Sequence, residues 1–132
     1  MKEEIVSRWI KKAHEDLRSA EYLIEMPEPP TGVICFHCQQ AVEKYLKAYL
    51  TYLDVRAPKT RDLAALFELC LEKDQDLKFL NLEGISALSF YAVSVRYPDE
   101  LYIPPEEEAK EAYNIAKEVK EFILQKISPR NT

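Results

Sequence analysis

Apolar residues recur every three or four positions along most of this chain, which is the spacing of amphipathic helices. Five segments carry the pattern: residues 3–25, 32–53, 61–72, 77–95 and 105 onward. Prolines at 27–30, 58, 98 and 104–105 separate most of these segments, as expected for residues that end helices. The pattern predicts an all-α fold: a single domain over residues 1–132, built as an antiparallel bundle of four long helices and one short helix.

The second segment is expected to lie at the centre of the bundle. Its polar residues form one narrow stripe, made of His37, Gln40, Lys44, Lys47, Thr51 and Asp54. The rest of its circumference is mostly apolar, and a helix with so narrow a polar stripe is usually surrounded by other helices.

The fourth segment has two apolar faces where a small bundle normally needs one. Leu77, Leu88, Ala92 and Val95 form the first face, and Phe79, Leu82, Phe90 and Val93 form a roughly opposite one. Neighbouring helices could cover both faces. Alternatively, the second face is a subunit interface, since a large exposed apolar patch is a liability for a monomer.

Three polar residues occupy positions where the pattern expects apolar ones. Asp16 shares the face of Trp9 and Ala13 in the first helix, and Gln39 and Glu43 lie within the apolar face of the second. Buried carboxylates need partners. One interpretation is a structural network that fixes the helices against each other; the other is a supporting network that orients Arg96 for function.

Residues 91–99 are the most distinctive in composition. Arg96 is expected at the carboxyl end of the fourth helix, and Pro98 forces the chain out of the helix just after Tyr97. An arginine there can hold a phosphate and a tyrosine can stack on a base. The alternative is a helix cap in which Arg96 pairs with Asp99 or Glu43.

The composition narrows the functional classes. A net charge of −5 disfavours indiscriminate binding to nucleic-acid backbones but allows a local basic site. The sequence contains no apolar run of membrane-spanning length, and its three cysteines fit no disulfide framework, so a cytoplasmic protein is expected. Cys35, His37 and Cys38 lack a second ligand pair, and no glycine-rich phosphate loop is present; neither a metal nor a cofactor is expected.

Four motifs in order resemble the prokaryotic HEPN family. They are Trp9-x3-Ala13-x2-Asp16-Leu17, Cys38-Gln39-Gln40-Ala41-x-Glu43-Lys44-x-Leu46-Lys47, Thr60-x-Asp62-Leu63 and Arg96-Tyr97-Pro98-Asp99. The resemblance implies a homodimeric helical bundle like the substrate-binding subunits of nucleotidyltransferases. It also implies a minimal nucleotidyltransferase as partner, in a toxin–antitoxin-like system, and nucleotide or RNA as ligand.

Many active members of that family are metal-independent ribonucleases with an Arg-x4–6-His motif. No histidine follows Arg96 within that window, and Arg61 stands where the family has histidine in Thr-His-Asp-Leu. His14 and His37 are expected on solvated faces of their helices.

Three hypotheses follow. The first is a binding or regulatory module that uses Arg96 and Tyr97, with Lys44 and Lys47 as contributors. The second is a ribonuclease in which Tyr97, Asp99 or Tyr102 replaces the histidine beside Arg96. The third is a structural adaptor for the partner protein.

Overall fold

The computed structural model describes residues 1–94 and 102–127, without the side chains of Val93 and Ser94. All regular structure in these residues is helical, which confirms the predicted class. The elements are α1 (Lys2–Ile24), α2 (Thr31–Tyr52), α3 (Leu63–Lys73), η1 (Gln75–Phe79), α4 (Leu82–Ala87), η2 (Leu88–Phe90), α5 (Tyr91–Ser94) and α6 (Glu106–Ile127). Both predicted ends of α1 and of α2, and the predicted start of α6, agree with the structure within one residue.

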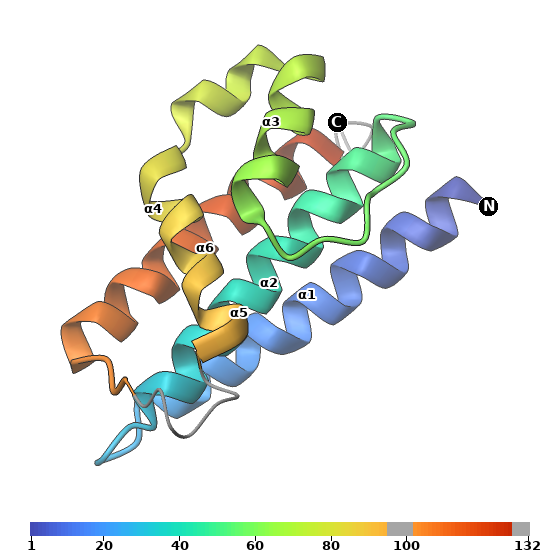
Figure 1. Ribbon diagram of the computed structural model, residues 1–132. Helices are drawn as coiled ribbons and strands as arrows, with labels where there is room; N and C mark the ends of the chain where they lie inside the picture. Colours follow the sequence, from blue (N-terminus) through green and yellow to red (C-terminus); the bar gives the residue numbers. More distant parts are fainter. Residues whose placement is uncertain (95–101, 128–132) are drawn as a thin grey trace.

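Helix α2 is the centre of the bundle, as its apolar composition predicted. It packs against α1, α6, α3 and α5, and 15 of its 22 residues are buried. Helix α1 runs back along α2 in the opposite direction, and α6 lies on the other side of α2 (Figure 1). The interior is filled mainly by side chains of α2, α6 and α3, including Tyr45, Leu46, Phe67 and Ile123.

The predicted polar stripe of α2 is not a solvated face. Gln40 and Lys47 are buried, and Lys44 and His37 keep only 21% and 27% of their side-chain surface exposed. Helix α1 supplies partners to part of the stripe: Asp16 contacts His37 and Lys44, and the Trp9 ring lies near Lys47.

Helix α3 begins at Leu63, two residues later than the predicted start at residue 61. Asp62 is its N-cap, because the Asp62 carboxylate accepts hydrogen bonds from the amides of Ala64 and Ala65, at 3.1 and 3.4 Å. The Thr60 hydroxyl accepts from the Asp62 amide. A carboxylate at this position satisfies two amides that lack partners within the helix.

The segment predicted as one helix over residues 77–95 is divided. The 3-10 turn η1 ends at Phe79, Leu80 is extended, and the Asn81 side chain caps a new helix by accepting from the Gly84 amide at 3.0 Å. The helical path then runs through α4, η2 and α5 to Ser94. Local side-chain capping interrupts the longer helix that the apolar spacing alone predicted.

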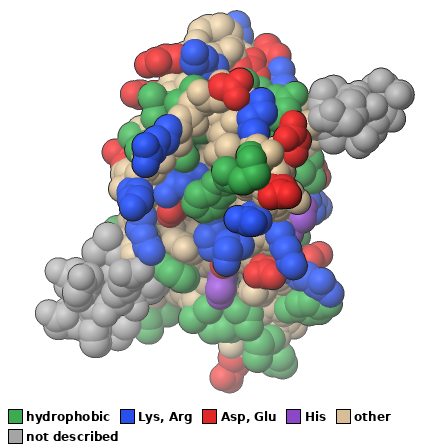
Figure 2. Space-filling view, turned by 90° about the vertical axis from the view of Figure 1, so that its right-hand side faces the viewer, with side chains coloured by type: hydrophobic (Ala, Val, Ile, Leu, Met, Phe, Trp, Pro, Cys, Tyr) green, Lys and Arg blue, Asp and Glu red, His purple; other side chains and the backbone are tan. Residues whose placement is uncertain are grey.

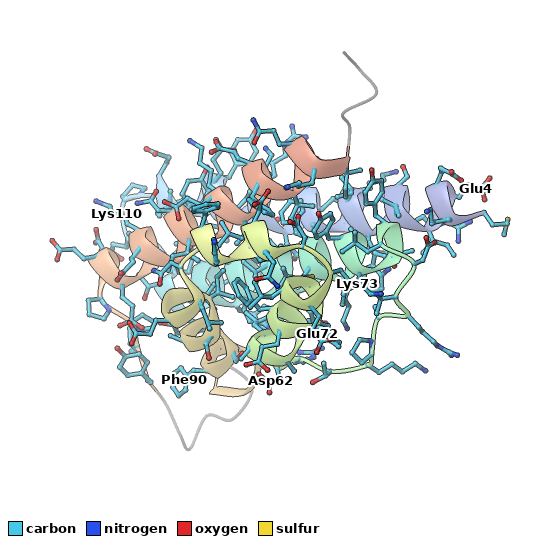
Figure 3. All side chains as sticks on the ribbon, turned by 90° about the horizontal axis from the view of Figure 1, so that it is seen from above. Glu4, Asp62, Glu72, Lys73, Phe90 and Lys110 are labelled. Atoms are coloured by element: carbon cyan, nitrogen blue, oxygen red, sulfur yellow. The ribbon has the colours of Figure 1, made fainter. Side chains whose placement is uncertain are left out.

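The two apolar faces of this segment have different environments. Leu77, Leu88 and Ala92 are buried, whereas Phe79, Leu82 and Phe90 are 75%, 39% and 52% exposed. Figure 3 shows Phe90 pointing away from the bundle. Helices α3 and α6 therefore cover one face only. The side chains of Val93 and Val95 lie outside the described residues.

Candidate functional site

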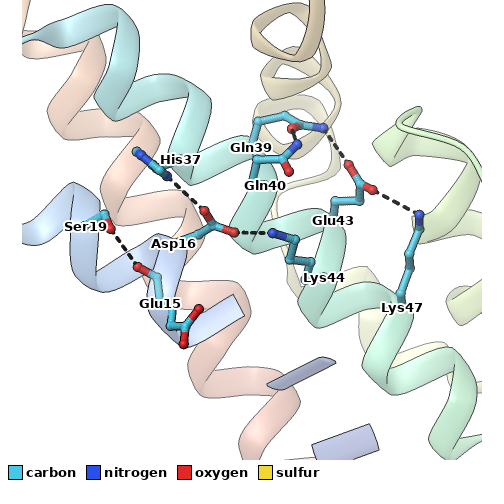
Figure 4. Close-up of polar contacts among 9 residues, drawn as sticks. All are labelled: Glu15, Asp16, Ser19, His37, Gln39, Gln40, Glu43, Lys44 and Lys47. Carbon is cyan, nitrogen blue, oxygen red and sulfur yellow. Dashed lines mark hydrogen bonds and ion pairs between the residues drawn. The ribbon is translucent and has the colours of Figure 1, made fainter. Parts of the chain in front are cut away.

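Asp16 joins α1 to α2 through two contacts. Its Oδ1 lies 2.9 Å from His37 Nδ1, and its Oδ2 accepts a hydrogen bond from Lys44 Nζ at 2.5 Å (Figure 4). Only 13% of the Asp16 side chain is exposed. A carboxylate this covered is stabilised by charged and hydrogen-bonding partners, and both partners come from the second helix.

A second set of contacts continues along α2. Gln40 donates to Gln39 at 2.7 Å, Gln39 donates to Glu43 at 3.3 Å, and Lys47 donates to the other oxygen of Glu43 at 3.0 Å. Gln39 Nε2 also donates to the backbone carbonyl of Arg61, at 3.4 Å, and so reaches the loop before α3. We refer to these groups together as the polar layer: Asp16, His37, Gln39, Gln40, Glu43, Lys44 and Lys47.

The polar layer is fully paired. Among the described residues, no buried side-chain nitrogen or oxygen lacks a hydrogen-bond partner. The Lys47 ammonium also lies 5.6 Å from the centroid of the Trp9 ring, a cation–π contact that adds a second link from α2 to α1. A network of this completeness fixes the register and rotation of the two helices.

The structure brings together five of the residues singled out from the sequence: Asp16, Gln39, Glu43, Lys44 and Lys47. Three further candidates, Arg96, Tyr97 and Asp99, lie outside the described residues. Three members of the arrangement were missed as partners: His37, Gln40 and Trp9. In the sequence, His37 and Gln40 belong to a polar stripe and Trp9 belongs to an apolar face, so these positions gave no indication of partners. The polar residues of the facing helix were the signal that could have identified them.

The prediction that both histidines have solvated positions was wrong. His37 contacts Asp16, and His14 Nδ1 lies 2.5 Å from the hydroxyl of Tyr45, with the two rings edge to face. Burial lowers the pKa of His14 below its ordinary value of 6.5, and the positive charge of Lys120 lowers it further. His14 therefore favours its neutral form at neutral pH.

This shift predicts a pH effect on stability. The folded protein resists protonation of His14, so the unfolded chain binds more protons as pH falls below about 6.5. The contribution of His14 to stability is complete above that pH and decreases as pH falls toward the lower pKa of the folded state. Urea unfolding at pH 7.5 and 5.5 should show a smaller loss in His14→Gln than in the wild type. Equal losses in the two proteins would contradict the assignment.

Tyr102, a candidate from the sequence, is held by a carboxylate. Its hydroxyl donates to Glu108 at 2.6 Å, and the hydroxyl of Tyr91 donates to the same carboxylate. Hydrogen bonding to Glu108 raises the pKa of the Tyr102 phenol. This keeps the phenol protonated, and therefore unsuited to act as a base near neutral pH.

The cysteines have the environment of core residues. Cys35, Cys38 and Cys70 are buried and unbridged, and burial raises the pKa of Cys35 to about 11. A neutral thiol is a poor nucleophile and metal ligand. Within residues 1–94 and 102–127, no group of three or more His, Cys, Asp or Glu side chains has the arrangement of a metal site.

Positive charge is concentrated in one stretch of this acidic chain. Residues 44–61 hold five of its 18 basic residues and one of its 23 acidic residues. Figure 2 shows Lys and Arg side chains gathered across the middle of one face. Within this stretch Lys44 and Lys47 belong to the polar layer, whereas Arg56, Lys59 and Arg61 are exposed and give a local basic surface despite the negative charge of the whole chain.

The comparisons with known proteins agree with this architecture. The model of the HEPN domain family matches residues 6–127, and the chain belongs to that family. The crystal structure of an archaeal HEPN homologue is similar to this fold, with a TM-score of 0.69 and 24% identity over 93% of this chain and 98% of the other. At that identity the likeness concerns the fold alone. No curated protein sequence matches the chain. In the described residues, no helix combines the length and apolar character needed to cross a membrane.

Proposed function

We propose that this HEPN protein is a nucleotide- or RNA-binding regulatory module that acts with a minimal nucleotidyltransferase partner, as in toxin–antitoxin-like pairs. Arg96 and Tyr97 are the proposed ligand contacts. Lys44 and Lys47 already pair with Asp16 and Glu43, so a phosphate would compete with those carboxylates for them. We therefore give the two lysines a secondary role in binding, and assign Asp16, Gln39 and Glu43 to positioning.

One observation favours binding over catalysis: both histidines are engaged between α1 and α2. Proton transfer to and from a ribose hydroxyl needs a group that can reach the substrate. Neither histidine follows Arg96 at the Arg-x4–6-His spacing, and each is held through Nδ1 by a side chain of the facing helix, Asp16 for His37 and Tyr45 for His14.

The second candidate function is a metal-independent ribonuclease that uses Arg96 without the usual histidine. Arg8 and His14 do have the Arg-x4–6-His spacing, but both lie in α1. Six positions along a helix turn two side chains about 120° apart around the axis, which disfavours joint action on one phosphate. Tyr97 and Asp99 remain the proposed proton-transfer candidates in this alternative.

The same proposal includes a homodimer. Phe79, Leu82 and Phe90 expose apolar surface on one side of the bundle, and Phe90 contacts the exposed Tyr102 ring at 5.8 Å between centroids. Exposed apolar side chains, such as the Phe90 and Tyr102 rings that contact each other, favour association with a second copy. We call these four residues the apolar face.

Arg96→Ala tests the binding function. We expect it to weaken the binding of a short single-stranded RNA or of ATP by at least about 10-fold, because one charge-assisted phosphate contact is lost. Fluorescence anisotropy with labelled ligands measures the change, and Lys110→Ala, an exposed cation of α6, is the matched control.

Two further results would redirect the proposal. Arg96-dependent RNA cleavage in the presence of a chelator would favour the ribonuclease. No binding by either the wild type or Arg96→Ala would leave only the adaptor role, measured as binding to the nucleotidyltransferase alone.

A further inference from the structure

Residues 53–62, between α2 and α3, form a loop whose two ends are both anchored. At its start the Val55 amide donates to Leu50 at 2.8 Å and the Asp54 amide donates to Thr51 at 3.0 Å, a helix-ending pattern in which Asp54 has a φ of 65°. At its other end the Arg61 carbonyl accepts from buried Gln39. Because Gln39 lies in the first half of α2, the loop returns along that helix, as Figure 1 shows.

The acidic and the basic residues of this loop differ in whether they are engaged by other groups. Of its two acidic residues, Asp54 pairs with Lys2 at 3.2 Å and Asp62 caps α3. Its three cations, Arg56, Lys59 and Arg61, are exposed and make no ion pair with any described residue. The loop therefore presents net positive charge on an anchored backbone, and anchoring reduces the entropy lost when a ligand binds.

A hollow adjoins the first of these cations. Its lining residues are Lys2, Ile5, Trp9, Thr51, Asp54, Val55, Arg56 and Ala57. Trp9 is partly exposed there and is the only tryptophan of the chain. An indole ring beside a guanidinium that makes no ion pair is suited to a ligand with an aromatic base and a phosphate.

We propose that this hollow and loop bind single-stranded RNA, with one base against Trp9 and its phosphate on Arg56, and with neighbouring phosphates on Lys59 and Arg61. The site is separate from Arg96 in the sequence and extends the proposed function, on which it rests. Stacking on an aromatic ring tolerates any base, so binding depends on strand charge more than on sequence.

The geometry of the loop favours a strand over a free nucleotide. Three exposed cations, Arg56, Lys59 and Arg61, are spaced along the loop, and five residues of chain allow the two arginines to lie up to about 17 Å apart. One nucleotide carries its phosphates within a smaller region, whereas several phosphates of a strand can meet cations spaced along the loop. The Asp54 carboxylate also lines the hollow, and its ion pair with Lys2 at 3.2 Å reduces its repulsion of the strand.

The single tryptophan gives a direct test. A ten-nucleotide uridine RNA is titrated into the wild-type protein, with Trp9 fluorescence and the anisotropy of a labelled RNA measured together. We expect quenching of Trp9 in step with binding. Arg56→Ala should weaken binding by about 10-fold and lower the slope of log affinity against log salt by about 0.7. Lys117→Ala, which removes an exposed cation of α6, should change affinity by less than about 2-fold.

Each contrary outcome has a different meaning. In one outcome, RNA binding depends on Arg96 but neither quenches Trp9 fluorescence nor weakens in Arg56→Ala. This outcome would overturn the site while keeping the proposed function. No RNA binding by the wild type would overturn both. Quenching by ATP with the same affinity and the same dependence on Arg56 would overturn the assignment to a strand, because a single nucleotide would then suffice.

Discussion

Replacing Glu43 by alanine is expected to lower the free energy of unfolding by about 3 kcal/mol, among the largest losses for a single polar substitution in this protein. The change leaves the Lys47 ammonium in a site where only 9% of its side chain is exposed, without the carboxylate 3.0 Å away. It also removes one acceptor from the buried amide of Gln39. Urea unfolding followed by circular dichroism measures the loss.

A double-mutant cycle identifies the cause. Glu43→Leu combined with Lys47→Met replaces both charges by apolar groups of similar volume, and the pair should cost much less than the sum of the two single changes. The reason is that neither charge is then left without a partner. Additive losses would mean that packing, not the ion pair, accounts for the effect.

Glu43→Gln distinguishes a structural role from a supporting role in binding. The amide keeps the shape of the carboxylate and can still accept a hydrogen bond, so the loss of stability should be smaller than for alanine. If the polar layer only holds α1 against α2, RNA affinity should fall only in variants whose free energy of unfolding also falls. A loss of affinity in a variant of nearly wild-type stability would instead support the positioning role.

The long helices could be predicted from the sequence because independent signals agree at their ends. The prolines at 27–30 separate α1 from α2, and Pro104 and Pro105 precede α6. Residues 77–95 lack such a signal inside their apolar pattern. The break there depends on which side chain caps the backbone, and Asn81 does so only once Leu80 is extended. Apolar periodicity alone does not indicate which side chain caps the backbone.

Several residues of the candidate site could be predicted from the sequence, but the contacts between them could not. Asp16, Gln39 and Glu43 were identified because they interrupt apolar faces. Their partners depend on how α1 is rotated against α2, which a single helix pattern does not determine. The same limit applies to His37, whose place on a polar stripe gave no indication that α1 would cover it.

The basic loop was missed for a related reason. Its cations are ordinary in sequence, and their importance arises from the return of the chain along α2, where the Arg61 carbonyl meets Gln39. The engagement of Asp54 and Asp62 elsewhere also becomes visible only in three dimensions. Local charge on a folded surface can therefore oppose the net charge of the chain.

Phe90→Glu is expected to separate the proposed homodimer into monomers, with a dissociation constant at least about 100-fold higher. In a symmetric pair the apolar face meets its own copy, so one substitution introduces two carboxylates into the same interface. Each would lose hydration without gaining a partner, and the two would repel each other. Sedimentation velocity across a range of concentrations measures the change.

Tyr22→Glu is the matched control for this prediction. Tyr22 is 67% exposed on α1 and does not belong to the apolar face, so the same change of an exposed aromatic residue to glutamate should leave the dimer intact. Because Phe90 is itself 52% exposed, its replacement should also leave the unfolding free energy of the monomer nearly unchanged. A wild-type protein that sediments as a monomer at all concentrations would remove the interface from the proposal. A dimer that both variants retain would place the interface on another surface, and the exposure of Phe79, Leu82 and Phe90 would then need a different partner.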